Sequence, residues 1–168
     1  LAVVGADPGG REIISFLREH KIRTDFVLVD IHDRTSYSLI LTAGIKDRTI
    51  LNCKGVVWHF PEFQIPWRQL LQTKWFYINH LGEKSHSLLP RLISAAKKYR
   101  IHIALNPGRT QLEHRKELLP LLKHIDVFIL NQEEASQFTK VPYENRKKIF
   151  DVLDERVRGI VIMTRGPK

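Results

Sequence analysis

The chain has 168 residues, 43% hydrophobic content and a formal charge of +9, which excludes a disordered chain and allows one domain or most of a larger one. No apolar run approaches the roughly 18 residues of a membrane span, and no signal peptide opens the sequence. The single cysteine, Cys53, excludes an internal disulfide and suits a reducing, cytoplasmic compartment. No two of the eight histidines have a spacing such as His-x-x-x-His, so we predict no metal site built from His or Cys.

The positive charge has three interpretations: nucleic-acid binding, a small anionic substrate such as a nucleotide, or a basic surface. Most Lys and Arg residues interleave with apolar residues at helical spacing, as in "AAKKYR", "EHRKELL" and "ENRKKIF". This pattern is typical of a solvated helix face. No zinc-finger, helix-turn-helix or RNA-binding signature accompanies it, so we predict no nucleic-acid partner and no membrane partner.

The first part of the chain is rich in predicted strands. Residues 1–20 predict a strand, a glycine-rich turn and a helix with one apolar stripe. The segments "DFVLVDI", "TSYSLILTA" and "RTILNC" predict three short strands, which we expect to form a small antiparallel meander over about residues 26–53. The turn Gly5-x-Asp7-x-x-Gly10 lacks the G-x-G-x-x-G spacing, so a Rossmann oxidoreductase is only weakly supported.

From Trp75 onward, predicted strands alternate with predicted helices. The strands are "WFYIN", "IHIALN", "DVFIL" and "GIVIMT". The helices are "SHSLLPRLISAAKKYR" with a Ser85 cap, "TQLEHRKELLPLLKH", "EEASQF" and "YENRKKIFDVLDERV". Such alternation indicates βαβ units and a parallel sheet over about residues 75–168. The predicted fold class is therefore α/β.

Polar side chains follow each of these four strands. In open parallel sheets, ligands bind beyond the carboxyl ends of the strands. Because all four strands should run in one direction, we expect these side chains to gather along one edge and form a site. They are Asn79 with His80, Asn106, Asn131 and Thr164.

Each of these termini also has a purely structural interpretation. Asn131-x-x-Glu134 is a helix N-cap followed by an acidic third residue, a pattern that also serves a functional site if the carboxylate points across the edge. The "NPGR" after strand "IHIAL" is an ordinary turn signal around Asn106. The "TRGPK" that begins at Thr164 is either an exit turn or a polyphosphate contact through hydroxyl, glycine backbone and basic charge.

Five segments in chain order carry a family resemblance. They are the Gly-x-Asp-x-x-Gly turn in "GADPGGREIISFLREHKI", the lid-like "RTSYSLILTAGIKDRTIL", the strand end "IALNPGRTQL", the Asn-x-x-Glu of "ILNQEEA", and the Thr-x-Gly of "VIMTRGPK". With this set the sequence resembles the PfkB or ribokinase-like family of carbohydrate and nucleoside kinases. The resemblance implies a three-layer fold with a mainly parallel sheet flanked by helices, a β lid at about residues 26–53, and a partial kinase domain over residues 1–168.

The resemblance also implies phosphoryl transfer from ATP, with Mg²⁺, to a hydroxyl of a sugar or nucleoside. It places Asn131 and Glu134 near the phosphates and the Mg²⁺, with Glu134 acting on the metal through water. The implied nucleotide-binding residues are Thr164, Arg165 and Gly166. The implied substrate-side and lid residues are Thr35, Asn106, Asp7 and Gly10. Family lids often pair across a homodimer, which this chain is then expected to form.

The sequence departs from the family pattern in three places. The Gly-Ala-Gly-Asp segment with the catalytic Asp is expected beyond Lys168, and the Gly-Gly-x-x-x-Asn segment before Leu1. Ser36 stands where the family often has Gly. We therefore expect the 168-residue chain alone to be catalytically inactive. The alternative hypothesis is a degenerate family member that acts as a nucleotide-binding, sugar-binding or regulatory module. The identity of the acceptor is not predicted.

Overall fold

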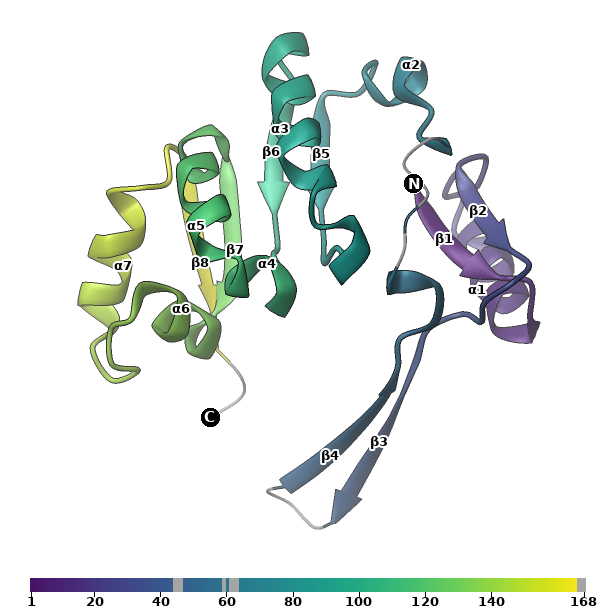
Figure 1. The fold of residues 1–168 in the computed structure, drawn as a ribbon, viewed down its shortest axis with the longest axis horizontal. Helices are drawn as coiled ribbons and strands as arrows, with labels where there is room; N and C mark the ends of the chain where they lie inside the picture. The colour runs from purple at the N-terminus through teal and green to yellow at the C-terminus, as the bar shows by residue number, and fades with distance from the viewer. Residues whose placement is uncertain (44–46, 59, 61–63, 166–168) are drawn as a thin grey trace. The chain divides into compact units, whose positions relative to one another are not determined.

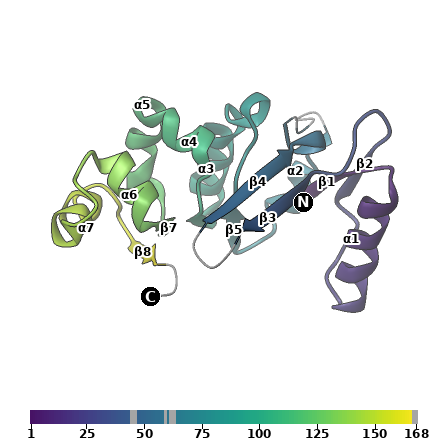
Figure 2. The same ribbon diagram turned by 90° about the horizontal axis from the view of Figure 1, so that it is seen from below.

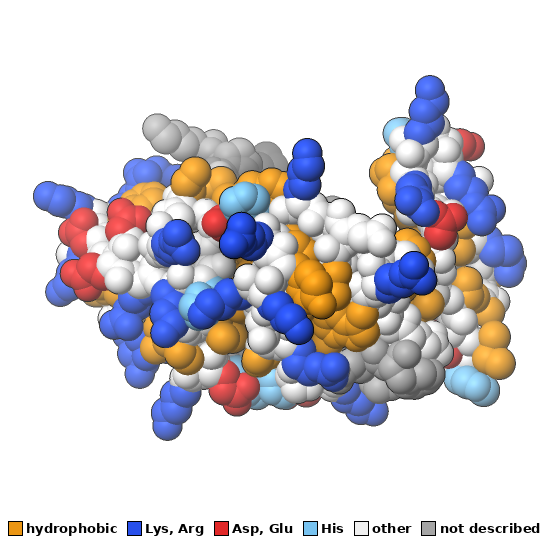
Figure 3. All heavy atoms as spheres, turned by 90° about the horizontal axis from the view of Figure 1, so that it is seen from above, with side chains coloured by type: hydrophobic (Ala, Val, Ile, Leu, Met, Phe, Trp, Pro, Cys, Tyr) orange, Lys and Arg blue, Asp and Glu red, His pale blue; other side chains and the backbone are white. Residues whose placement is uncertain are grey.

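The computed structural model describes residues 1–43, 47–58, 60 and 64–165. These belong to two compact units, residues 1–61 and 62–168, each of which is described by itself (Figure 1). Among the described residues, no helix is long and apolar enough to cross a membrane. On the face that Figure 3 draws, Lys and Arg side chains are dispersed among hydrophobic and acidic ones and do not form one block.

The first unit opens with a strand, a helix and a second strand. β1 (Ala2–Gly5) leads into α1 (Pro8–Glu19), and β2 (Val27–Asp30) pairs parallel with β1, Ala2 opposite Val27. The prediction of a three-stranded antiparallel meander was therefore wrong in its first strand. A helix between two strands brings the chain back to its starting edge, which makes the second strand parallel to the first. Local apolar spacing identified β2 as a strand but did not specify its partner.

The other two segments of the predicted meander form a hairpin. β3 (Tyr37–Ala43) and β4 (Asp47–Cys53) pair antiparallel from Tyr37 opposite Cys53 to Ala43 opposite Asp47, and η1 (Gly55–Trp58) follows. Both views draw the hairpin as a long two-stranded ribbon (Figure 1, Figure 2). Adjacent side chains point to opposite faces, and Leu39 and Ile40 are each 53% exposed. Neither face of the hairpin is therefore buried.

The second unit contains the predicted parallel sheet. After α2 (Trp67–Leu70), four strands lie side by side in the order β5-β6-β7-β8, and every pair is parallel. Their bounds are Trp75–Ile78, His102–Leu105, Val127–Asn131 and Ile160–Thr164. The α/β class, with a parallel sheet, flanking helices and a separate antiparallel β element, is confirmed.

The connections between these strands are helical. They are η3 (Glu83–Ser85), α3 (Leu88–Tyr99), α4 (Arg109–Glu113), α5 (Arg115–Leu118), η4 (Leu119–His124), α6 (Gln132–Thr139) and α7 (Arg146–Asp154). Because the strands are neighbours in chain order, right-handed crossovers bring all these helices to one face of the sheet. The core of the unit lies there. Its fully buried members include Ile93, Leu105, Leu122, Phe128, Leu130, Ile149 and Leu153.

Two details of the predicted helices were wrong. Ser85 is not the cap of α3, because it lies in the preceding η3 turn and is buried, while the residue before α3 is Ser87. The single helix predicted over residues 110–124 is broken into three pieces. His114 leaves the helical region with ψ 42°, and Pro120 lacks the N–H that an α-helix interior requires.

Candidate functional site

The register of the sheet brings the polar strand ends to one edge. Ile78 is opposite Leu105, so β5 and β6 end level, whereas Leu105 is opposite Phe128 and β7 continues three residues further, to Asn131. At the far end of this edge, Asn131 is directly opposite Thr164. The expected convergence of the strand ends on one edge is what the structure shows.

Asn131 and Glu134 form a reciprocal capping box at the start of α6. The Asn131 side-chain oxygen accepts a hydrogen bond from the Glu134 backbone N–H at 2.8 Å, and Glu134 Oε2 accepts one from the Asn131 backbone N–H at 2.8 Å. The capping interpretation of Asn-x-x-Glu is therefore correct as geometry. Within the described part of the chain, the second carboxylate oxygen of Glu134 has no hydrogen bond, so it keeps its lone pairs for a ligand.

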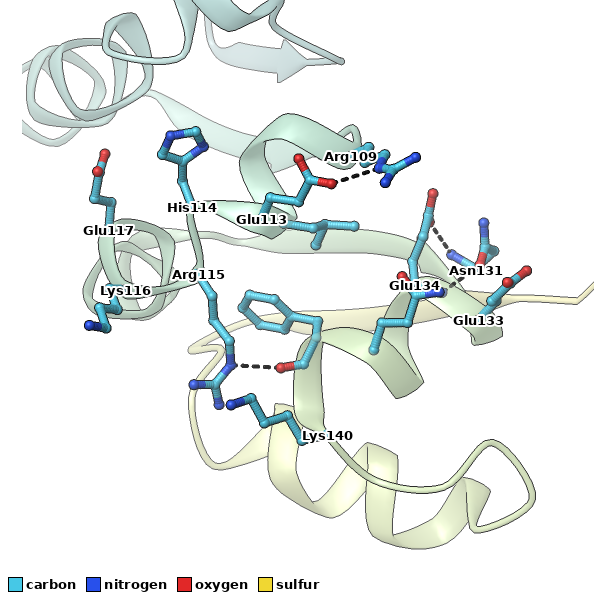
Figure 4. A pocket seen from close by; sticks show the side chains of 13 residues that line it. Arg109, Glu113, His114, Arg115, Lys116, Glu117, Asn131, Glu133, Glu134 and Lys140 are labelled. Atoms are coloured by element: carbon cyan, nitrogen blue, oxygen red, sulfur yellow. Dashed lines mark hydrogen bonds and ion pairs between the residues drawn. The ribbon is translucent and has the colours of Figure 1, made fainter. Parts of the chain in front are cut away.

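These two residues line a cavity of about 890 Å³ between α4 and α5 on one side and α6 on the other (Figure 4). The charges that line it are balanced. The basic residues are Arg109, Arg115, Lys116 and Lys140, and the acidic residues are Glu113, Glu117, Glu133 and Glu134. The volume falls in the range of small-ligand pockets.

Two of the four cations in the cavity are already engaged. Arg109 pairs with Glu113 at 2.7 Å, and Arg115 Nε donates to the Phe138 carbonyl at 2.7 Å. Lys116 and Lys140 form no ion pair within the described ranges, and both are flexible ammonium groups. An anionic ligand in this cavity would therefore find two lysine charges that no carboxylate of the described chain neutralises.

His114 lies at the wall of this cavity, at the junction of α4 and α5. Its Nδ1 lies 2.8 Å from the Thr110 carbonyl, which identifies Nδ1 as the protonated nitrogen. This hydrogen bond raises the pKa of His114; nearby glutamates, Glu117 first, raise it further, and partial desolvation opposes them.

The remaining residues predicted at this edge have the following positions. The side chains of Thr164 and Arg165 are exposed, while Gly166 lies outside the described residues. Asn106 is half-buried, and its Nδ2 lies 3.5 Å from the phenolic oxygen of Tyr77. His80 packs against the turn that follows Asn106, since a Cβ added to Gly108 would meet its Nδ1 at 1.6 Å.

In the first unit, Asp7, Gly10 and Thr35 come together. Asp7 Oδ1 accepts hydrogen bonds from the Gly10 N–H at 2.8 Å and the Thr35 hydroxyl at 2.7 Å, and Oδ2 accepts one from the Thr35 N–H at 2.8 Å. The Thr35 hydroxyl also accepts from the Gly5 N–H at 2.9 Å. These bonds, that from Gly10 most of all, lower the pKa of the Asp7 carboxyl below its ordinary value.

The glycines of Gly5-x-Asp7-x-x-Gly10 are required by this close approach. A Cβ added to Gly10 would meet the Gly5 carbonyl oxygen at 2.1 Å, and one added to Gly5 would meet the Thr35 nitrogen at 2.5 Å. Both distances are shorter than any real contact. The spacing therefore encodes a packed turn that binds the base of the β3–β4 hairpin, a role that sequence reasoning did not assign to it.

Comparison with known proteins gives the family. The family described as pfkB family carbohydrate kinase matches residues 1–168, the whole chain. The chain belongs to this family. A search of curated proteins found no match.

Solved structures of pfkB-type kinases share the fold. A putative ribokinase II of E. coli, without ligand, superposes with a TM-score of 0.82 at 17% identity, covering 99% of this chain and 56% of its own. Arabidopsis thaliana ribokinase, solved with ribose and ATP, gives 0.74 at 17%, covering 97% and 53%. A Burkholderia thailandensis nucleoside kinase, solved with inosine, gives 0.69 at 14%, covering 99% and 52%.

This pfkB-family chain therefore spans a little over half the length of the solved structures that it resembles. Its two clusters of predicted site residues are built on the same plan, a strand that ends in a turn and caps the next helix. Asp7, Gly10 and Thr35 form one cluster, and Asn131, Glu134 and Thr164 the other.

Proposed function

We propose that the protein is a phosphotransferase that transfers a phosphoryl group from ATP to a hydroxyl of a sugar or nucleoside. The observation that carries this proposal is the pairing of Asn131 with Thr164 at a strand edge beside a cavity of about 890 Å³. Membership of the pfkB family supports it, as do the ribose, ATP and inosine in the solved relatives.

The geometry suits phosphoryl transfer because this reaction needs little covalent chemistry from the protein. It needs positioned donors and neutralised phosphate charge. In our proposal Lys116 and Lys140 approach the phosphates from α5 and from the end of α6. The Thr164 hydroxyl donates a hydrogen bond to a phosphate oxygen, and Arg165 and Gly166 extend this contact.

Mg²⁺ fits the donors at the Asn131 junction. Mg²⁺ prefers one or two carboxylates, several waters and phosphate oxygens, and Glu134 offers a half-buried carboxylate that the capping box holds in place. We propose that Glu134 binds a water of the ion, with Glu133 beside it on the cavity wall. When bound, Mg²⁺ supplies charge neutralisation for the phosphates.

We further propose that the β3–β4 hairpin (residues 37–53) is the lid over the acceptor in a partial kinase domain, a shorter segment than the expected 26–53 because β2 pairs with β1. The apolar side chains on both of its faces are exposed, which suits an element that is covered by substrate or by a second lid in a homodimer. The Thr35 hydroxyl donates its hydrogen bond to Asp7. In our proposal the role of Thr35 is therefore to anchor the lid. Asn106 remains the proposed acceptor-side residue of the second unit.

Binding of Mg²⁺-ATP to the 168-residue chain tests the site. Glu134→Gln keeps an oxygen for the cap but removes the charge, so we expect affinity for ATP to fall about tenfold with Mg²⁺ and to change little without it. Glu144→Gln, an exposed glutamate outside the cavity lining, is the matched control. Isothermal titration calorimetry measures both. Equal effects of the two variants would contradict the proposed site.

Turnover separates an enzyme from a binding module. The complete gene product is screened for ATP consumption against a panel of sugars and nucleosides. Phosphorylation of one acceptor supports the kinase, and ATP binding without turnover supports a binding or regulatory module. The 168 residues contain no Gly-Ala-Gly-Asp segment. We therefore propose that this chain alone has no activity in the same assay, and that a reducing buffer, which matches the expected cytoplasmic location, does not change this result.

A further inference from the structure

A second cluster of polar side chains lies apart from the strand edge, where η3 faces the junction of α4 and α5. It contains Glu83, His86 and His114, and one ligand atom from each lies within 4.8 Å of the others. The carboxylate of Glu117 adjoins it, with Glu117 Oε2 at 3.8 Å from His86 Nε2. Local geometry produces both halves of the cluster, because residues three apart in a helical turn project from the same side.

The two imidazole rings present the same nitrogen to the cluster. His86 Nδ1 lies 2.7 Å from the Glu83 carbonyl oxygen, and His114 Nδ1 lies 2.8 Å from the Thr110 carbonyl oxygen. Each Nδ1 therefore carries the hydrogen, which leaves the Nε2 lone pair available. A backbone carbonyl that fixes the tautomer in this way is the usual support of a metal-binding histidine. The rings are stacked with centroids 4.2 Å apart and planes 22° apart, so their Nε2 atoms lie side by side and their in-plane lone pairs run nearly parallel.

An independent observation indicates a ligand at the same place. Gln111 is 2% exposed and lines a cavity of about 10 Å³ together with His86, His114 and Glu117. Its Oε1 accepts a hydrogen bond from the Gly108 N–H, but its Nε2 has no partner within the described residues. A buried amide donor without an acceptor costs about 1–3 kcal/mol, unless a bound group supplies the acceptor. A cavity of this size is at the lower limit for one water molecule.

We propose that Glu83, His86, His114 and Glu117 bind a divalent transition-metal cation such as Zn²⁺. Imidazole nitrogen with carboxylate oxygen is a ligand set for Zn²⁺, whereas Mg²⁺ and Ca²⁺ take oxygen ligands. Tetrahedral Zn²⁺ needs its ligand atoms roughly 3.3 Å apart, given metal–nitrogen distances near 2.0 Å. Rotation of the exposed Glu83 and Glu117 side chains brings their oxygens closer, and one imidazole turns out of the stack so that both Nε2 atoms reach the ion. A metal-bound water then accepts the hydrogen bond of Gln111.

The ion would act as a clip inside the second unit. It would join the turn before α3 to the α4–α5 junction, which otherwise meet here through the histidine stack and the 3.8 Å approach of Glu117 Oε2 to His86 Nε2. His114 and Glu117 also line the larger cavity, so the clip would fix one wall of that cavity. Sequence reasoning predicted no His-based metal site because the histidines lie far apart in the chain and only the fold brings them together.

The test is Zn²⁺ titration of the 168-residue chain without an affinity tag, by calorimetry, in a buffer that contains millimolar Mg²⁺. We expect saturable binding of one ion per chain and a higher Tm. His86→Ala and His114→Ala should each weaken binding at least about tenfold, and Glu83→Gln should weaken it less. His32→Ala removes an exposed histidine from the first unit and is the matched control.

Absence of saturable Zn²⁺ binding would overturn the proposal, and so would equal affinities of His86→Ala, His114→Ala and the His32→Ala control. Glu83→Gln decides the matter if circular dichroism shows that an alanine variant has lost its fold. Co²⁺ provides a second readout, because a tetrahedral site gives strong visible absorption that the variants should lose. The outcome does not depend on kinase activity, so it is separate from the fate of the proposed function.

Discussion

Two strand-turn-helix junctions in this chain, β1–α1 and β7–α6, have the same layout but differ in the hydrogen bonds that stabilise them. At the first, Asp7 caps α1 and also accepts two hydrogen bonds from Thr35, 28 residues away. At the second, Asn131 caps α6, and its only partner in the box is Glu134, three residues away. The first junction is a tertiary contact, and the second is local.

The difference indicates which side chains are available for chemistry. Asp7 uses both of its carboxylate oxygens on the Gly10 and Thr35 groups, which makes it a positioning residue at the base of the hairpin. Glu134 spends one carboxylate oxygen on the cap and directs the rest of its carboxylate toward the cavity (Figure 4). A local cap therefore fixes the Glu134 side chain while leaving its second carboxylate oxygen available.

The largest expected effect is at the glycine that the first junction requires. Gly10→Ala should lower the free energy of unfolding by about 3 kcal/mol, because its Cβ would meet the Gly5 carbonyl oxygen at 2.1 Å. Gly9→Ala is the control: its Cβ would lie 3.6 Å from Asp7 Oδ1, an ordinary contact, and we expect a change within about 1 kcal/mol on the stabilising side. Urea unfolding followed by circular dichroism measures both. Similar losses in the two variants would show that the turn is not packed in this way.

The next effect tests the long-range bond. Thr35→Val removes the hydroxyl but keeps the shape, which leaves the buried Gly5 N–H unpaired and takes one donor from Asp7. We expect a loss of about 2 kcal/mol in the free energy of unfolding. Thr35→Ser keeps the hydroxyl and should cost about 1 kcal/mol or less. The prediction fails if valine is tolerated as well as serine in the same urea titration.

A smaller effect is expected at the local junction. Asn131→Ala removes the cap of α6 and should lower the free energy of unfolding by about 1 kcal/mol. Asn131→Asp preserves a capping oxygen and should differ from the parent by about 0.5 kcal/mol or less. If Asn131→Ala were more costly than Thr35→Val, the two junctions would not differ as described.

The smallest effect is on pH dependence. The folded-state pKa of Asp7 is lowered, so its carboxylate stabilises the fold above the pKa of the unfolded chain, and this stabilisation is lost as the pH falls through the folded value. Asp7→Asn should therefore have a shallower loss of stability between about pH 5 and pH 2. Urea midpoints across this range measure the slope. An unchanged slope would mean that Asp7 titrates alike in the folded and unfolded chains.

Sequence patterns predicted much of the second unit. The four strands and the capping box around Asn131 depend on apolar spacing and on side chains three residues apart, and both are local properties. The long helix predicted over residues 110–124 failed because the backbone turns at His114, where the ring bonds back to the Thr110 carbonyl. No local pattern announced the break at His114, whereas Pro120 is a local signal for the second break.

The sequence by itself determined the order of strands and helices and the side chains available at each strand end, because these follow from neighbours within one or two turns of chain. Only the tertiary structure decided that β2 pairs with β1, that Thr35 meets Asp7, and that His86 stacks on His114. Each of these contacts joins residues that are far apart in the sequence. Such contacts are selected by packing and by the need to pair buried polar groups, which act on the folded chain as a whole.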